Sequence, residues 1–159
     1  MALHLLDSNN GYAASNDGSI YRTTNGGTNW NFLASTFGTP NDITFPRTGT
    51  IATGYTCGDN GAIYSVTSLG ANVMTSGDVS NLKSITFLTA TEGWLCGQAV
   101  ILHFASGTWQ AGQTYPSGTY NAIYFIDNQN GWAVGNNGII IHTTDGHNWV
   151  AQTNPDPQS

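Results

Sequence analysis

Short apolar runs alternate with clusters of Gly, Asn and Asp along the whole chain, and the alternation is clearest near the C-terminus. Four runs rich in β-branched and aromatic residues, which favour strands, follow one another there: Asn121–Ile126, Trp132–Gly135, Ile139–Thr144 and Trp149–Gln152. The segments between them contain Asn137-Gly138 and Asp145-Gly146, dipeptides that supply the positive φ angles of tight hairpins. This part of the chain therefore predicts four antiparallel strands joined by short turns.

The same unit recurs about every 40 residues. Each copy has a glycine followed by an aromatic or apolar run, and the four copies are Gly11-Tyr12-Ala13-Ala14, Gly54-Tyr55-Thr56-Cys57, Gly93-Trp94-Leu95-Cys96 and Gly131-Trp132-Ala133-Val134. The glycines are separated by 43, 39 and 38 residues. A repeat of this length is typical of architectures in which one unit cannot bury its apolar face without a neighbour.

Four units of four antiparallel strands predict an all-β fold, a small β-propeller of about four blades. The glycine density and the lack of a sustained 3.6-residue period argue against helices. Four blades can close alone, be completed by a second chain to form an eight-bladed ring, or stack in a larger assembly. We predict one domain over residues 1–154, a C-terminal tail over 155–159, and blades at approximately 1–36, 37–78, 79–116 and 117–154.

The charge of the chain excludes two classes of partner. The 159 residues carry a formal net charge of −6, and Lys and Arg together number only 3. Nucleic-acid binding depends on neutralising several phosphates, and an anionic membrane surface likewise attracts basic segments. We therefore expect no nucleic-acid partner and no membrane partner, and no apolar run reaches the length of a transmembrane helix.

The two cysteines occupy the same position of neighbouring repeats. Cys57 and Cys96 each stand three residues after the repeat glycine, where the other repeats have Ala14 and Val134. A position that accepts Ala, Val and Cys is typical of a small apolar core site. We favour two packed thiols over a disulfide, and no Cys or Cys/His metal-binding spacing is present.

Two segments resemble a known family of repeats. Thr23-Thr24-Asn25-Gly26-Gly27-Thr28-Asn29-Trp30 resembles the Asp-box, or bacterial neuraminidase repeat, with Asn in place of its Asp. Gly131-Trp132-Ala133-Val134-Gly135, followed by Thr143-Thr144-Asp145-Gly146-His147-Asn148-Trp149, is similar to the repeat of the photosystem II stability/assembly factor family. The resemblance implies a β-propeller. It also implies two activities to weigh, a sialidase and an assembly chaperone that meets its client through a basic patch.

The residues argue against a sialidase. Enzymes of that family clamp the substrate carboxylate with three arginines, whereas this chain has only Arg22 and Arg47, and its sole glutamate is Glu92. Most of the aspartates lie in Asn/Asp/Gly turns, where a short side chain bonds the local backbone. His103 and His142 share one repeat position, but a stable metal site needs three or more converging ligands. We predict no catalytic residues, no metal, no cofactor and no enzymatic activity.

The aromatic residues are the remaining candidates for a binding site. One group follows the repeat glycine and another precedes the last strand of a repeat: Tyr12, Tyr55, Trp94, Trp132, and Trp30, Trp109, Trp149. They either pack between blades, as aromatic residues commonly do, or serve as quasi-equivalent shelves for sugar rings whose weak binding adds up through avidity.

The sequence as a whole favours a non-enzymatic interaction or structural module. We expect a surface-exposed component of a larger assembly, such as a phage particle or a cell-surface structure, with protein partners and self-association. The N-terminal residues have no basic segment and only a short apolar run, so we expect no signal peptide, and the expected location is extracellular or on the surface of a virion. A glycan-binding, lectin-like propeller and an assembly chaperone are the alternatives.

Overall fold

The computed structural model describes residues 1–48, 52–111 and 115–154. In these residues the chain forms sixteen β-strands in four separate four-stranded antiparallel sheets. Within each sheet the strand order follows the chain order, as the hairpin turns predict. The predicted all-β propeller fold of four four-stranded blades is therefore confirmed, and the predicted tail at 155–159 lies outside the described residues.

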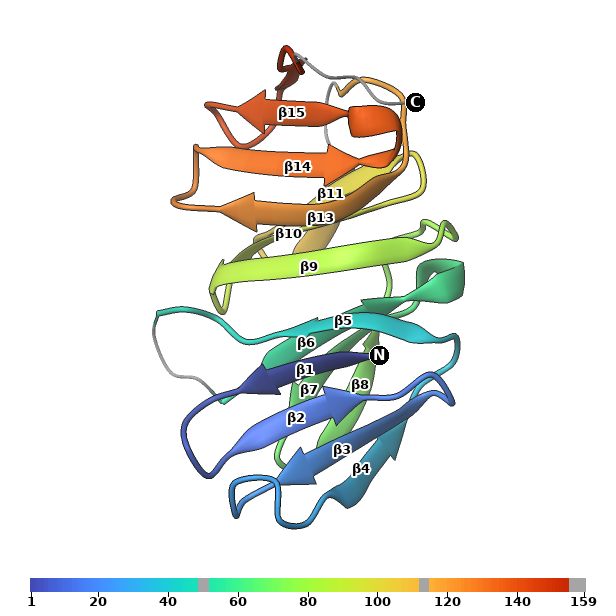
Figure 1. Cartoon of the computed structure of the whole chain (residues 1–159), viewed down its shortest axis with the longest axis vertical. Coiled ribbons are helices and arrows are strands. Elements are labelled where there is room, and N and C mark those ends of the chain that lie inside the picture. The colour runs from blue at the N-terminus through green and yellow to red at the C-terminus, as the bar shows by residue number, and fades with distance from the viewer. Residues whose placement is uncertain (49–51, 112–114, 155–159) are drawn as a thin grey trace.

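Each sheet is one blade, and its first strand lies on the inner side of the arrangement (Figure 1). Blade 1 consists of β1 (Ala2–Leu5), β2 (Gly11–Ala14), β3 (Ser19–Thr23) and β4 (Asn31–Ser35). Blade 2 consists of β5 (Pro40–Thr44), β6 (Gly54–Gly58), β7 (Ile63–Thr67) and β8 (Gly70–Met74). Blade 3 consists of β9 (Leu82–Thr89), β10 (Glu92–Gly97), β11 (Val100–Ala105) and β12 (Thr108–Ala111). Blade 4 consists of β13 (Tyr120–Phe125), β14 (Gly131–Gly135), β15 (Ile140–Thr143) and β16 (Trp149–Ala151).

The turns have the backbone geometry that their sequences predict. Two short 3-10 helices, η1 (Asp59–Gly61) and η2 (Asn136–Gly138), join the second and third strands of blades 2 and 4. In η2, Asn137 and Gly138 have φ angles of 57° and 67°, a region that glycine and asparagine adopt most readily. In the described part of the chain these are the only helices, and neither is long and apolar enough to cross a membrane.

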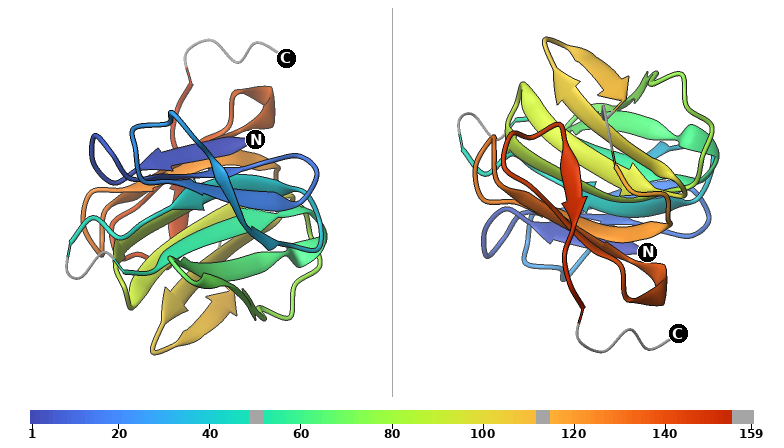
Figure 2. Two further views of the ribbon diagram at one scale, coloured as in Figure 1. Left: turned by 90° about the horizontal axis from the view of Figure 1, so that it is seen from below. Right: turned by 90° about the horizontal axis from the view of Figure 1, so that it is seen from above.

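The four blades form an open arc. The inner strands lie in the order β1, β5, β9 and β13, each in contact with the next. Figure 1 shows blades 1 and 4 at opposite ends of the long axis, and Figure 2 looks onto these two ends. The described chain therefore does not close a ring on its own, which removes one of the alternatives that the sequence leaves open.

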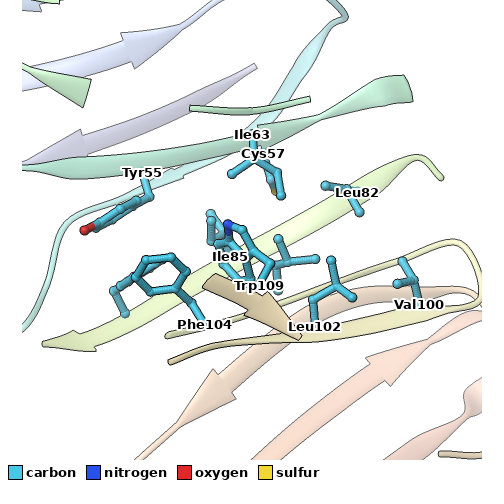
Figure 3. Close-up of a cluster of buried hydrophobic side chains, with 11 residues drawn as sticks. Tyr55, Cys57, Ile63, Leu82, Ile85, Val100, Leu102, Phe104 and Trp109 are labelled. Carbon is cyan, nitrogen blue, oxygen red and sulfur yellow. The ribbon is translucent and has the colours of Figure 1, made fainter. Parts of the chain in front are cut away.

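The core is divided among the three interfaces between neighbouring blades. Three clusters of buried apolar side chains join blade 1 to blade 2, blade 2 to blade 3, and blade 3 to blade 4. Figure 3 shows the middle cluster, in which Tyr55 and Cys57 of blade 2 face Leu102 and Phe104 of blade 3. Because side chains alternate between the two faces of a strand, each inner blade contributes one face to each of two clusters.

The cysteines lie in two different clusters. Cys57 faces blade 3 and Cys96 faces blade 4, and both are buried free thiols, so the preferred interpretation of two packed thiols is confirmed. Burial raises the pKa of both thiols, because the charged thiolate loses its hydration. Neither thiol is therefore in the ionised form that reacts readily at neutral pH.

Candidate interaction surfaces on the end blades

Five of the seven candidate aromatic residues are buried in the interfaces between blades. These are Tyr12, Tyr55, Trp94, Trp109 and Trp149. The other two, Trp30 and Trp132, are each 37% exposed, and they lie on the two end blades. This distribution matches packing between blades for the buried five, while ligand binding by any of the seven stays a prediction.

The three buried aromatic residues that follow a repeat glycine share one packing arrangement. The aromatic side chain that follows the repeat glycine packs on a phenylalanine in the first strand of the next blade, or just beyond its end. The ring centroids of Tyr12 and Phe45 are 4.7 Å apart, and those of Tyr55 and Phe87, and of Trp94 and Phe125, are 3.7 Å apart.

In blades 3 and 4, a tryptophan of the last strand completes the cluster. Trp109 meets Phe87 edge-on with centroids 5.8 Å apart, and Trp149 meets Phe125 in the same way at 5.6 Å. In blades 3 and 4, each phenylalanine therefore lies between a tryptophan of its own blade and an aromatic ring of the preceding blade. The edge-on contacts of the two tryptophans are a favourable geometry for aromatic pairs.

Trp94 also makes a hydrogen bond across the interface. Its indole Nε1–H donates to the carbonyl oxygen of Gly146 at 3.0 Å, and its ring stacks on His103 with centroids 4.7 Å apart. His103 in turn lies 2.6 Å from Glu92 through Nε2 and Oε1. The indole is therefore fixed on both faces and at its polar edge.

Blade 4 presents the corresponding aromatic residue, Trp132, and is the last blade of the described residues. The face of blade 4 that points away from blade 3 is called here the last end face, and it comprises Tyr124, Trp132, Val134, His142 and Val150. Trp132 stacks on His142 with centroids 4.3 Å apart, as Trp94 does on His103. The Nε2 atom of His142 is buried and has no hydrogen-bond partner.

Blade 1 presents the face that, in blades 2 to 4, receives the aromatic residue of the preceding blade. The face of blade 1 that points away from blade 2 is called here the first end face, and it comprises Leu3, Leu5, Tyr21, Trp30 and Phe32. Leu5 stands 6 residues before Gly11, as Phe87 and Phe125 stand 6 residues before Gly93 and Gly131. Leu5 is 60% exposed, whereas Phe87 and Phe125 are fully buried.

A cavity opens on the first end face beside Leu5. It has a volume of about 240 Å³, and its lining includes Leu3, Leu5, Thr23, Gly26 and Trp30. Gly26 corresponds to Gly146, because the Gly26 amide donates to Asn9 and the Gly146 amide donates to Gln129 at the same point of the repeat. The cavity therefore lies where the repeat places the aromatic residue of a preceding blade.

Sequence reasoning singled out Trp30 and Trp132 but missed Leu3, Leu5, Phe32 and Tyr124. The signal for Leu5 was present in the spacing to the repeat glycine, which aligns it with buried phenylalanines. The sequence contains no corresponding signal for Leu3, Phe32 and Tyr124, because their exposure depends on whether the ring of blades closes.

A second cavity, of about 370 Å³, follows the inner strands, and its lining includes His4, Asp42, Arg47 and Tyr124. The Arg47 guanidinium lies 4.4 Å from the centre of the Tyr124 ring and donates to the Tyr124 hydroxyl at 2.9 Å and to the Phe125 carbonyl oxygen. Blade 2 is thus linked to blade 4 across the edge of blade 3. The groove is a second surface where a ligand can reach polar groups.

Asp42 is held inside this groove by the neighbouring blade. Its carboxylate accepts hydrogen bonds from the Ile85 amide and the Ser84 hydroxyl, both at 2.9 Å, and from the Ile43 amide at 2.8 Å. Burial nevertheless raises the pKa of Asp42, because loss of hydration outweighs these bonds. The carboxylate serves as a link between blades 2 and 3.

Other aspartates are used in turns. Asp7, Asp127 and Asp145 each accept hydrogen bonds from the backbone amides two and three residues later, and Asp17 accepts one from the amide of Ser19. These bonds favour the charged form and lower the pKa of all four carboxyl groups. In the described residues, no three His, Cys, Asp or Glu side chains gather in a way that could hold a metal ion.

Asp145→Asn is expected to lower stability at neutral pH by about 0.5–1 kcal/mol, since the exposed carboxylate makes charge-assisted bonds that solvent weakens. The folded pKa of Asp145 lies below its ordinary value of 3.8. The carboxylate therefore stabilises the fold above pH 4, and this contribution is lost as the pH falls through the folded pKa. Urea unfolding of both proteins between about pH 7 and pH 2 should show converging midpoints.

Blade 1 supplies the matched control, because Asn25 occupies the corresponding position. Asn25 accepts from the Asn29 amide and from the Thr23 hydroxyl, both at 3.0 Å. Asn25→Asp should add stability above pH 4 by the same mechanism. A difference between Asp145→Asn and the wild type that did not change with pH would contradict the assignment.

Comparison with known proteins extends the description of the fold. The sequence matches no protein-family model and no curated protein. The structure is similar to YCF48 in a complex with D1 peptide, with a TM-score of 0.66, 16% identity, and coverage of 94% of this chain and 50% of that one. It is similar to an ancestral GH74 enzyme, with a TM-score of 0.74, 17% identity, and coverage of 97% and 24%.

A third similar structure is of comparable size. The computationally designed Ika4 protein matches with a TM-score of 0.72 and 14% identity, over 91% of this chain and 90% of that one. By contrast, the chain spans half or less of YCF48 and of the GH74 enzyme. At these identities the similarity defines the fold alone, and the fold is a β-propeller arrangement of four four-stranded blades.

Proposed function

We propose that this chain is a non-enzymatic interaction module that is built into a larger assembly through its two end faces. The observation that carries the proposal is the exposure of apolar side chains at both ends of the arc. Leu3, Leu5 and Phe32 on the first end face are 59%, 60% and 62% exposed. Tyr124 and Val150 on the last end face are 55% and 67% exposed.

Such exposure is unusual for a surface that remains in contact with water. Large contiguous apolar patches on soluble proteins mark interaction sites, and aromatic residues are enriched in protein–protein interfaces. Both end faces are also sheet faces whose counterparts in the inner blades are buried. A protein surface that covers them would complete the same packing.

The chemistry of the polar residues supports a role without catalysis. The carboxylates described above are bound to local backbone in turns, to the neighbouring blade at Asp42, or to His103 at Glu92. Lys83 lies 3.6 Å from Asp59, and Arg47 is engaged with Tyr124. Each of these charged groups therefore has a partner within the fold that accounts for its position.

The similar structures support a protein partner, since one of them is YCF48 bound to a peptide. An assembly chaperone would use such a contact, but the three cationic side chains of this chain do not form the basic face that the family resemblance implies. We place the module on the surface of a particle, such as a virion, or of a cell. Self-association is part of the proposal.

The test is chemical cross-linking of the protein in its native source, followed by mass spectrometry. We expect cross-links from residues that border the end faces, such as the N-terminal amine beside β1, to other polypeptides or to further copies. Recovery of the protein as a free monomer, with cross-links only inside the chain, would contradict the proposal. A glycan array tests the lectin alternative, which predicts binding that Trp132→Ala and Trp30→Ala abolish.

A further inference from the structure

We infer that the two end faces are complementary halves of one interface, so that blade 4 of one copy docks on blade 1 of a second copy. Two chains then close a ring of eight blades. This inference rests on the proposed function, and it specifies the partner as a second copy of the same chain. It is argued from the contacts that the three internal interfaces already show.

Each end of the arc supplies the residue that the other end lacks. Inside the chain, Tyr12, Tyr55 and Trp94 each pack on a phenylalanine of the next blade. Trp132 is the fourth member of this series, and no blade follows it within the described residues. Leu5 is the corresponding apolar residue of blade 1, and no described blade precedes it. If Trp132 of one copy packs on Leu5 of another, the contact that joins neighbouring blades within the chain is repeated between the two copies.

The lining of the cavity on blade 1 corresponds to that of the site that receives Trp94 on blade 4. Trp94 enters a site on blade 4 formed by Phe125, Trp149 and the Gly146 turn. The cavity of about 240 Å³ on blade 1 is lined by the corresponding residues Leu5, Trp30 and Gly26. Leucine is smaller than phenylalanine, which leaves room beside Trp30 for an incoming ring.

The two end faces also carry complementary hydrogen-bonding groups. Trp94 donates its indole N–H to the Gly146 carbonyl across the internal interface. The Gly26 carbonyl stands at the corresponding point of blade 1 and can accept from Trp132 of the second copy. His142 behind Trp132 would lie over the Gly27 turn, where His103 meets His147 with centroids 4.8 Å apart in the internal interface.

The symmetry of the contact determines how many copies can form a closed ring. The contact joins two different surfaces, so it is heterologous, and a heterologous contact forms either a closed ring or an open filament. Propellers close with about four to eight blades. Two copies of four blades reach eight, whereas three copies would exceed that number. A two-chain ring is therefore the closed assembly that this interface allows.

The experiment measures the mass of the purified chain by light scattering across a range of concentrations. We expect the wild type at twice the chain mass of 16.8 kDa. Trp132→Ala and Leu5→Glu should each weaken dimerisation at least about tenfold, as removal of a central interface residue does. Val79→Glu is the matched control, because Val79 is 82% exposed but lies between β8 and β9, beside Gly61 of η1 and on neither end blade.

Mixing the two variants tests the direction of the contact. Each homodimer would carry the same defect in both interfaces, whereas a mixed pair would have one intact interface. The intact one joins Trp132 of the Leu5→Glu chain to Leu5 of the Trp132→Ala chain. We therefore expect heterodimers on mixing, weaker than the wild-type dimer. Circular dichroism of each variant establishes that the strands are retained.

The alternative outcomes overturn the inference in distinct ways. A wild-type monomer at every concentration excludes the second copy, and a dimer that both variants retain excludes these residues. A mass above two chains excludes the closed pair. The proposed function is judged separately, because cross-links from the end faces to a different protein in the native source would support it even if the purified chain is monomeric.

Discussion

Replacing Trp94 with alanine is expected to lower the free energy of unfolding by about 3–5 kcal/mol, the usual cost of removing a buried large aromatic side chain. Trp94 is fully buried between the rings of Phe125 and His103. The substitution leaves a cavity between blades 3 and 4 and removes the donor to the Gly146 carbonyl. Small domains have a total stability of only about 5–15 kcal/mol, so urea unfolding should show a large loss.

The chain contains its own control for this prediction. Trp132 occupies the same repeat position and stacks on the corresponding histidine, but it is 37% exposed. Trp132→Ala should cost less than about 1 kcal/mol, as most surface substitutions do. Both substitutions are best compared in the Leu5→Glu background, so that any dimer does not contribute to stability. Equal losses at the two positions would contradict the assignment of Trp94 to an internal interface and Trp132 to a free end.

The pair Trp94 and Trp132 also shows how far the sequence predicts the structure. The repeat period, the strands and the hairpins follow from glycine, asparagine and β-branched residues, and these local signals act within one blade. The same local signals make the two tryptophans equivalent. Their burial differs because one has a following blade and the other does not, and this depends on the whole arrangement of the blades.

The open arc itself could not be predicted from the repeats. Each repeat supplies four complete strands, so the sequence shows no missing strand or exchanged strand at either end. Closure depends on the rotation between neighbouring blades, which is set by side-chain packing such as Tyr55 on Phe87. Long-range polar links, such as Arg47 to Tyr124 across blade 3, are also invisible to local patterns.

The candidate site was predictable in part, for the same reason. Trp30 and Trp132 were selected by their repeat positions, together with five residues that turn out to be interblade packing. Leu5 was hidden because a leucine at the end of a short strand is an ordinary core residue by composition. Only its alignment with Phe87 and Phe125, followed by its exposure in the structure, marks it as half of a contact.

Gly93→Ala is expected to be the second strongly destabilising change, with a loss of about 3 kcal/mol from overpacking. A Cβ atom at this position would lie 2.6 Å from Cγ of Phe87. The Phe87 ring cannot move aside, because it stacks on Tyr55 with centroids 3.7 Å apart and meets Trp109 on its edge. The midpoint of urea unfolding should therefore shift to a much lower concentration.

Gly11→Ala is the matched substitution at the same repeat position. Its Cβ would lie 2.6 Å from Cδ2 of Leu5, the end of a flexible and exposed side chain that can rotate away. The next contact, 3.2 Å to the His4 carbonyl oxygen, requires a shift of only a few tenths of an ångström. We expect a change of less than about 1 kcal/mol in unfolding, since alanine also restricts the unfolded chain. The displaced leucine would disturb the receiving site for Trp132, so dimerisation should weaken while the fold is retained. Equal destabilisation by Gly93→Ala and Gly11→Ala, measured in the Trp132→Ala background where the dimer is weakened, would contradict the expectation that Leu5 is free to move aside whereas Phe87 is not.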